Sequence, residues 1–208
     1  MGRFKVTKQD TFIDMTPMSD VMVLLLTFFM LTATFVKDEP VKVNTPGSVS
    51  DIKIPANNLL TIFVSPKGKV FLSMDSPQGM RSIAEQINAD QEATVVSDIE
   101  TFAQLPMFGT PMNVLNQWMK LENRNDLLNS NSPEAGIPCG SGEEGSLEKD
   151  ELKIWVTAAR EACGENMRIA IKADQRTPYK TIKNVMNSLR SIHENRYNLI
   201  TSLKGADD

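Results

Sequence analysis

Residues 21–35 read VMVLLLTFFMLTATF, an apolar run in which the only polar side chains are threonines. Extended to residues 17–36, the stretch is 20 residues long, and a helix of that length measures about 30 Å, close to the hydrocarbon thickness of a bilayer. The run has no amphipathic face, which argues against a helix buried in a globular core. It also lacks the small-residue cleavage site of a signal peptide. The sequence therefore predicts one membrane-spanning helix over residues 16–36.

The residues before this run predict how the helix begins and how it is oriented. Thr16 followed by Pro17 is typical of a helix start, with a side-chain cap and then proline at the first helical position. Three basic residues, Arg3, Lys5 and Lys8, lie in the leader formed by residues 1–15. By the positive-inside rule they favour a cytoplasmic N-terminus, so the residues after the span are expected across the membrane.

Asp20 is the only charged residue within the predicted span. An ionised carboxylate there costs about 2.5–3.5 kcal/mol on insertion scales, and less toward the helix end. A boundary residue that reaches headgroup water is one interpretation. However, Asp20, Thr27 and Thr34 recur every seven residues and fall on one helical face. This spacing favours a polar stripe that faces another helix or a pore, where an apolar environment would promote proton uptake by the carboxyl group.

Three stretches resemble the ExbD/TolR family of biopolymer transport proteins, in which an I-x-x-T-P-M-x-D-V motif opens a single span with one essential aspartate. The first is FIDMTPMSDVMVLLLTFFMLTATF, residues 12–35. The second, residues 51–72, resembles the strand–turn–strand region after the family's span, and the third, residues 167–189, resembles its second signature. Residues 76–165 depart from the usual short connection. The motif residues matched here are Ile13, Thr16, Pro17, Met18, Asp20 and Val21.

This resemblance implies a single-pass inner-membrane subunit of a proton-driven motor. An ExbB/TolQ-like polytopic subunit is expected to surround a small number of these helices, two copies in our interpretation, and a TonB-like protein is expected to receive the motion and energise transport across the outer membrane. Asp20 would carry the proton from the periplasm to the cytoplasm, with Thr27 and Thr34 along its path. The alternative is a TolR-like, membrane-anchored periplasmic scaffold that binds peptidoglycan or envelope protein in envelope maintenance or motility.

The rest of the chain predicts a periplasmic linker over residues 37–58, an α+β domain over 59–203 and a tail over 204–208. The domain is expected to have helices on one face of a small mixed sheet, with the inserted region at about 76–165. Residues 122–150 are polar and rich in Gly and Ser, which predicts an exposed loop. The predicted strands are 59–65, 69–74, 168–173 and 197–203, and the predicted helices are 80–89, 111–121, 146–163 (capped by Ser146) and 177–195 (capped by Thr177).

Cys139 and Cys163 both lie in the inserted region, and in an oxidising periplasm they are predicted to form a disulfide. Two unpaired, buried thiols are the alternative. Together with the single His193, these cysteines offer too few soft ligands for a metal site. The sequence has no recognisable catalytic constellation or cofactor motif, so no enzyme is expected. The 22 Lys and Arg against 26 Asp and Glu give a net charge of −4, which argues against a nucleic-acid partner.

Overall fold

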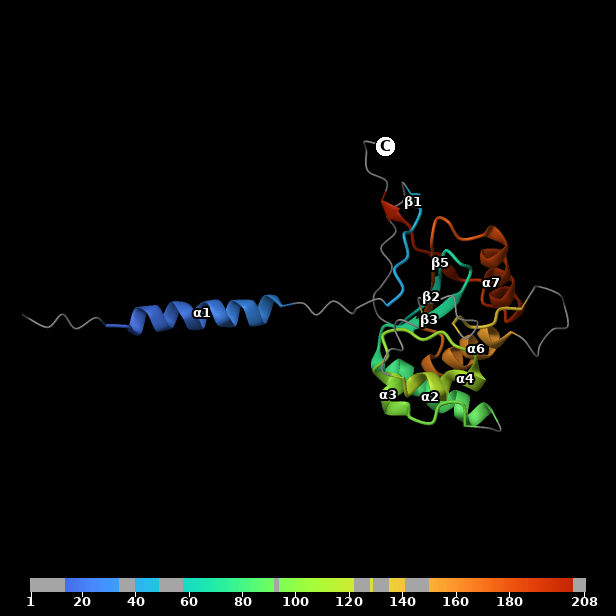
Figure 1. Ribbon diagram of the computed structural model, residues 1–208, viewed down its shortest axis with the longest axis horizontal. Coiled ribbons are helices and arrows are strands. Elements are labelled where there is room, and N and C mark those ends of the chain that lie inside the picture. Colours follow the sequence, from blue (N-terminus) through green and yellow to red (C-terminus); the bar gives the residue numbers. More distant parts are fainter. Residues whose placement is uncertain are drawn as a thin grey trace, which may run out of the picture. The chain divides into compact units, whose positions relative to one another are not determined.

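The computed structural model describes residues 14–33, 40–48, 58–91, 94–121, 128, 135–140 and 150–203. The chain divides into two compact units, Met1–Lys37 and Asp38–Asp208. The first unit contains helix α1 (Thr16–Thr32), and the second contains the sheets and the remaining helices (Figure 1).

Helix α1 has 17 residues and starts with the T-P-M motif. The predicted Thr16 cap is wrong: Thr16 is the first helical residue, Met15 occupies the N-cap position, and no side chain caps the helix. Asp14 instead binds Thr16. Its Oδ1 accepts hydrogen bonds from the Thr16 N–H at 3.0 Å and the Thr16 hydroxyl at 2.5 Å. Pro17 lies in the first turn, where its missing N–H is not needed. Along the described residues no helix is both long enough and apolar enough to cross a membrane, and the predicted extension to residue 36 falls largely on residues that are not described.

The second unit is built on a mixed four-stranded sheet with the order β3–β2–β4–β5 (Figure 1). Strands β2 (Leu59–Val64) and β3 (Val70–Met74) form the predicted antiparallel hairpin. Strand β4 (Arg168–Ala173) pairs in parallel with β2, and β5 (Tyr197–Leu199) pairs in parallel with β4. The predicted α+β architecture with a small mixed sheet is confirmed.

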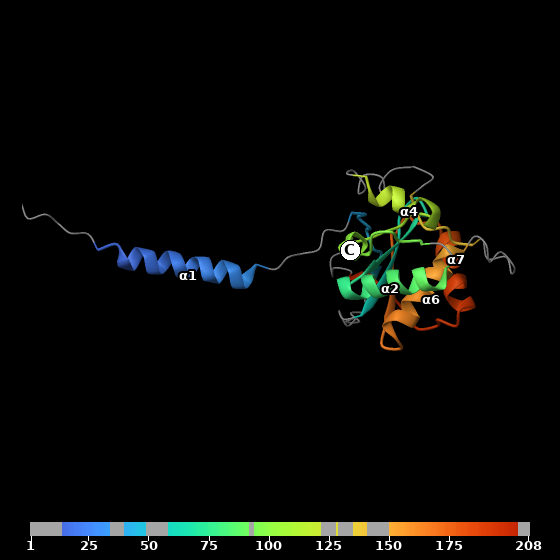
Figure 2. The same cartoon turned by 90° about the horizontal axis from the view of Figure 1, so that it is seen from below.

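Five helices of this unit fall within the described residues. They are α2 (Pro77–Asp90), α3 (Ile99–Ala103), α4 (Met112–Met119), α6 (Glu151–Cys163) and α7 (Tyr179–Ser191). All but α3 correspond to predicted helices with shifted ends, and α2 and α6 pack side by side (Figure 2).

Two of the predicted helix starts are wrong. Helix α6 begins at Glu151 with Asp150 at its N-cap position, while Ser146 lies outside the described residues. Helix α7 begins at Tyr179, and Thr177 does not cap it. The Thr177 hydroxyl instead donates to the Ser65 carbonyl at 3.1 Å, which joins the start of α7 to the end of β2.

The inserted region forms part of the hydrophobic core. Phe102, Phe108 and Trp155 are at most 1% exposed, and their rings lie 4.7–5.9 Å apart. Trp118, on α4, is also buried. The prediction that residues 122–150 form an exposed loop is wrong where the structure describes them, because these positions include three buried apolar residues, Leu128, Ala135 and Ile137. The insertion therefore completes the core of the domain.

The linker contains a short strand that the sequence did not predict. Strand β1 (Gly47–Ser48) pairs in parallel with β6 (Ser202–Leu203), so the predicted final strand at 197–203 is divided between two sheets. The Asn44 N–H donates to Asp174 Oδ2 at 2.9 Å, and Val41 is buried in the core. Residues 40–48 are thus attached to the domain.

Candidate functional site

Asp20 is the only charged residue in α1. Its side chain is exposed, and within the part of the chain that the structure describes it forms no hydrogen bond or ion pair. A carboxyl group in this setting is open to a proton or to a donor from another chain.

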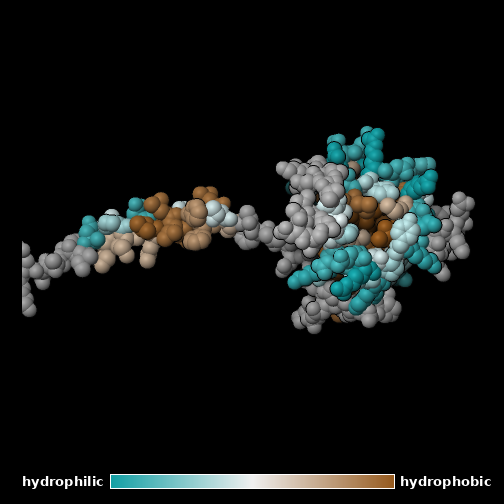
Figure 3. Space-filling model, turned by 90° about the horizontal axis from the view of Figure 1, so that it is seen from above, coloured by the Kyte–Doolittle hydropathy of each residue, from teal (hydrophilic) through white to brown (hydrophobic). Residues whose placement is uncertain are grey.

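After Asp20 the side chains of the helix are apolar on every face, except for Thr27 and Thr32. Figure 3 shows brown and tan residues along most of α1, with hydrophilic residues near its N-terminal end. A helix of this kind is suited to lipid or to the apolar faces of other helices. The large apolar residues between positions 21 and 31 that are more than half exposed are Val21, Met22, Val23, Leu24, Leu25, Leu26, Phe28, Phe29, Met30 and Leu31.

Thr27 shares a helical face with Asp20 but does not contact it. Seven residues at about 1.5 Å each separate them by roughly 10 Å along the axis, whereas direct proton transfer needs about 2.6–3.2 Å between heavy atoms. The Thr27 hydroxyl donates to the Leu24 carbonyl at 2.9 Å, so its proton is bound within the helix. The third member of the predicted stripe, Thr34, lies outside the described residues.

The predicted disulfide is wrong for this structure, because Cys139 and Cys163 are both free. Cys139 lies near Asp150 at the N-terminal end of α6, and Cys163 is the last residue of that helix. Twelve helical steps of about 1.5 Å place the two ends roughly 18 Å apart, while a disulfide requires Cα atoms within about 7 Å. Burial raises the pKa of the Cys139 thiol to about 12 and also raises the pKa of Cys163. Both are therefore poor nucleophiles.

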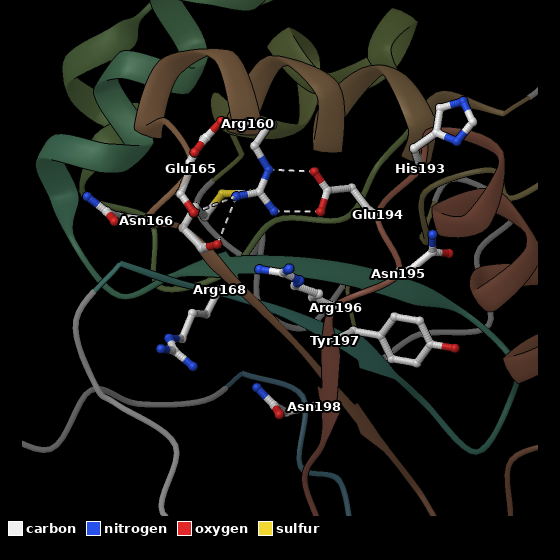
Figure 4. A pocket seen from close by; sticks show the side chains of 11 residues that line it. Arg160, Glu165, Asn166, Arg168, His193, Glu194, Asn195, Arg196, Tyr197 and Asn198 are labelled. Carbon is white, nitrogen blue, oxygen red and sulfur yellow. Dashed lines mark hydrogen bonds and ion pairs between the residues drawn. The ribbon is translucent and has the colours of Figure 1, made fainter.

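A polar cavity of about 840 Å³ lies at the ends of strands β4 and β5 (Figure 4). One wall is the ion pair between Arg160 of α6 and Glu194, which follows α7. The guanidinium donates from Nε to Oε1 and from Nη2 to Oε2 of Glu194, each at 2.5 Å. Its Nη1 donates to the Met167 carbonyl at 2.9 Å. This pair joins the inserted helix to the segment before β5.

Two further arginines, Arg168 and Arg196, line the same cavity, and the sequence-based prediction missed them. Their signal in the sequence was a basic residue at the start of one strand, Arg168 of β4, and one directly before another, Arg196 before β5. His193, predicted to be a solvated surface residue, is exposed at the edge of this cavity. Across the described ranges, no group of three or more His, Cys, Asp or Glu side chains is placed to hold a metal ion.

Comparison with known proteins gives two matches. A family model described as "Biopolymer transport protein ExbD/TolR" matches residues 7–204. The chain is also similar to the biopolymer transport protein ExbD of Aquifex aeolicus (strain VF5). The two are 24% identical over 112 residues, which cover 49% of this chain and 85% of that protein. No solved structure matches the chain.

Proposed function

Because the chain belongs to the ExbD/TolR family, we propose that it is the proton-accepting subunit of an inner-membrane motor that energises TonB-dependent transport across the outer membrane. Members of this family are non-enzymatic transport components that are anchored in the inner membrane and act with ExbB/TolQ-type partners. The observation that carries the proposal is the position of Asp20 as the single charge in the apolar helix α1.

The membrane anchor in this proposal is α1 together with the residues that follow it. The 17 residues of α1 give a helix about 26 Å long, a few ångströms short of the roughly 30 Å hydrocarbon core. Residues 33–36 read ATFV, so the apolar stretch of the sequence continues past the end of the helix at Thr32. With the N-terminus in the cytoplasm, Asp38–Asp208 would be the periplasmic unit.

Protonation of Asp20 provides the coupling step. An ionised carboxylate in the span costs about 2.5–3.5 kcal/mol, and movement of one charge through 100 mV is worth about 2.3 kcal/mol. These magnitudes are close, so uptake and release of one proton can switch α1 between two arrangements against an ExbB/TolQ-type partner. Since Thr27 lies about 10 Å farther along the helix, water or partner groups must complete the path, and Thr27 and Thr34 line it as hydrogen-bond acceptors.

The decisive experiment measures proton flux in vesicles that contain the full chain and an ExbB/TolQ-type partner. Asp20→Asn removes the titratable group with little change in size, and it should abolish flux while co-purification with the partner is retained. Asp14→Asn is the matched control, because Asp14 lies just outside α1 and an asparagine oxygen can still accept the bonds from Thr16. Wild-type flux in Asp20→Asn would refute the proton role.

A TolR-like scaffold is the alternative, and it is supported by the compact unit Asp38–Asp208 with a polar cavity of its own. A scaffold needs α1 only as an anchor. In cells that depend on this chain, Asp20→Asn should then preserve envelope integrity. The motor proposal expects the same variant to lose TonB-dependent uptake. Measuring envelope integrity and TonB-dependent uptake in Asp20→Asn cells therefore distinguishes the scaffold from the motor.

A further inference from the structure

Arg168, the first residue of β4, and Arg196, the residue directly before β5, both line the polar cavity. Ile169 of β4 pairs with Tyr197 of β5 in parallel register, so the two arginines each lie one residue before a paired position. Neighbouring strands run about 4.8 Å apart, and the backbones of the two arginines are therefore close.

Alternation along the strands puts both arginine side chains on one face of the sheet. Ile169 is fully buried and Tyr197 packs against the core. Their chain neighbours Arg168, Arg196 and Asn198 therefore face the opposite way. Figure 4 draws both side chains among those that line the cavity.

The described residues supply no anion to these arginines. Glu194 is engaged by Arg160, and neither Arg168 nor Arg196 forms an ion pair or side-chain hydrogen bond with any described residue. Glu165, the other carboxylate on the cavity wall, is exposed, and its side chain pairs with no residue in the described part of the chain. Both arginines are exposed, so solvent weakens their mutual repulsion, and an anion bound by both guanidinium groups would remove it.

We infer that the cavity is an oxoanion-binding site in which Arg168 and Arg196 together hold a phosphate or carboxylate group of a ligand. Each guanidinium offers a planar fork of N–H donors that matches such groups. The Asn198 side-chain amide lines the same cavity and can donate a further hydrogen bond. The volume of about 840 Å³ leaves room for more of the ligand than its anionic group. The site is independent of Asp20, so either proposal can fail without the other.

Thermal unfolding of the purified full chain in detergent tests this site. Trp118 and Trp155, the two tryptophans of the chain, are buried in this unit and report its unfolding by fluorescence. Sodium phosphate is titrated against sodium chloride at equal ionic strength, because a ligand that binds only the folded state raises the midpoint. Acetate and citrate form separate arms that distinguish carboxylate from phosphate recognition.

The variants are Arg168→Gln, Arg196→Gln and the double substitution, with Arg190→Gln as the control on the exposed side of α7. Each single variant should weaken phosphate binding on the order of tenfold or more, and the double variant should show no specific stabilisation. Arg190→Gln should behave as wild type. Arg168→Lys keeps the charge but loses the planar fork, so it should also bind more weakly.

A second measurement separates ligand binding from a structural role. In chloride at low ionic strength, Arg168→Gln should unfold at the same temperature as wild type or higher, since one of two repelling charges is removed. A stabilising structural arginine would give a lower midpoint. The inference is overturned if phosphate, citrate and acetate stabilise wild type no more than chloride does, or if the double variant responds to them as wild type does.

Discussion

Arg160→Ala should cost this domain more stability than loss of any surface ion pair. The side chains of Arg160 and Glu194 are only 25% and 16% exposed. Arg160 also donates to the Gly164 carbonyl at 3.2 Å and the Met167 carbonyl at 2.9 Å. The substitution removes all of these bonds at once and leaves the Glu194 carboxylate partly buried without its partner.

The expected loss in the free energy of unfolding lies between those of an exposed and a fully buried ion pair. Exposed ion pairs contribute about 0–1 kcal/mol, and breaking a fully buried pair costs about 3–5 kcal/mol. At the exposure of Arg160 and Glu194 we expect a loss of about 2–3 kcal/mol in the free energy of unfolding. For a unit of this size, that corresponds to a midpoint lower by roughly 5–10 °C.

Urea unfolding followed by tryptophan fluorescence measures this loss, and Arg81→Ala is the matched control. Arg81 pairs with Glu85 at 3.1 Å and Glu100 at 2.9 Å, but all three side chains are more than half exposed. Its removal should cost less than about 1 kcal/mol. The stability loss of Arg160→Lys should lie between those of Arg160→Ala and Arg81→Ala, because a lysine keeps the charge without the planar fork. Equal losses in Arg160→Ala and Arg81→Ala would refute the reasoning.

Three further outcomes follow from the core and the thiols. Gly109→Ala should lower the free energy of unfolding by about 1–3 kcal/mol, because a Cβ there would lie 2.2 Å from Cδ1 of Phe71; chemical denaturation measures it. Trp155→Ala should cost about 3–5 kcal/mol, since it empties a site that is 1% exposed; calorimetry of the full chain checks this. Cys139 and Cys163 should react with a thiol reagent only slowly at pH 8, because burial raises the pKa of each thiol. A reductant should leave the unfolding midpoint unchanged, because both thiols are free. A midpoint that falls on reduction would instead support the disulfide.

The elements with strong periodicity could be predicted from the sequence. Strand β4 alternates Ile169 and Ile171 with Arg168 and Lys172 around the small Ala170, and its predicted bounds agree with the structure. The β2–β3 hairpin has a Pro-Lys-Gly turn between two apolar runs, and Gly68 adopts a φ of 76° there, a conformation that favours glycine. The register of the hairpin follows from this turn.

The features that were missed depend on contacts between distant residues. Strand β1 has two residues, Gly47 and Ser48, too few to show a period. The segment 135–140 reads as a polar loop, but the Ile137 N–H donates to the Val70 carbonyl at 2.8 Å and the side chain of Ile137 is buried against the core. Sequence spacing likewise does not reveal that Cys139 lies near the N-terminal end of α6 while Cys163 lies at its other end.

The inserted helix α6 is tied at both ends to the region around α7. At its start, the carboxylate of Asp150 is 4% exposed and accepts a hydrogen bond from the Ser188 hydroxyl of α7 at 2.7 Å. At its end, Arg160 binds Glu194 just after α7. In the linker, the Asn44 N–H donates to the carboxylate of Asp174, which lies in the connection between β4 and α7. Residues 40–48 are held by the Asn44 bond to the β4–α7 connection, by Val41 in the core and by the pairing of β1 with β6, so a force that reaches the domain through them acts on the β4–α7 connection among these points. The two polar contacts of α6 then resist movement of α7 away from the inserted region, so in the proposed motor the insertion makes this domain stiffer where the linker joins it.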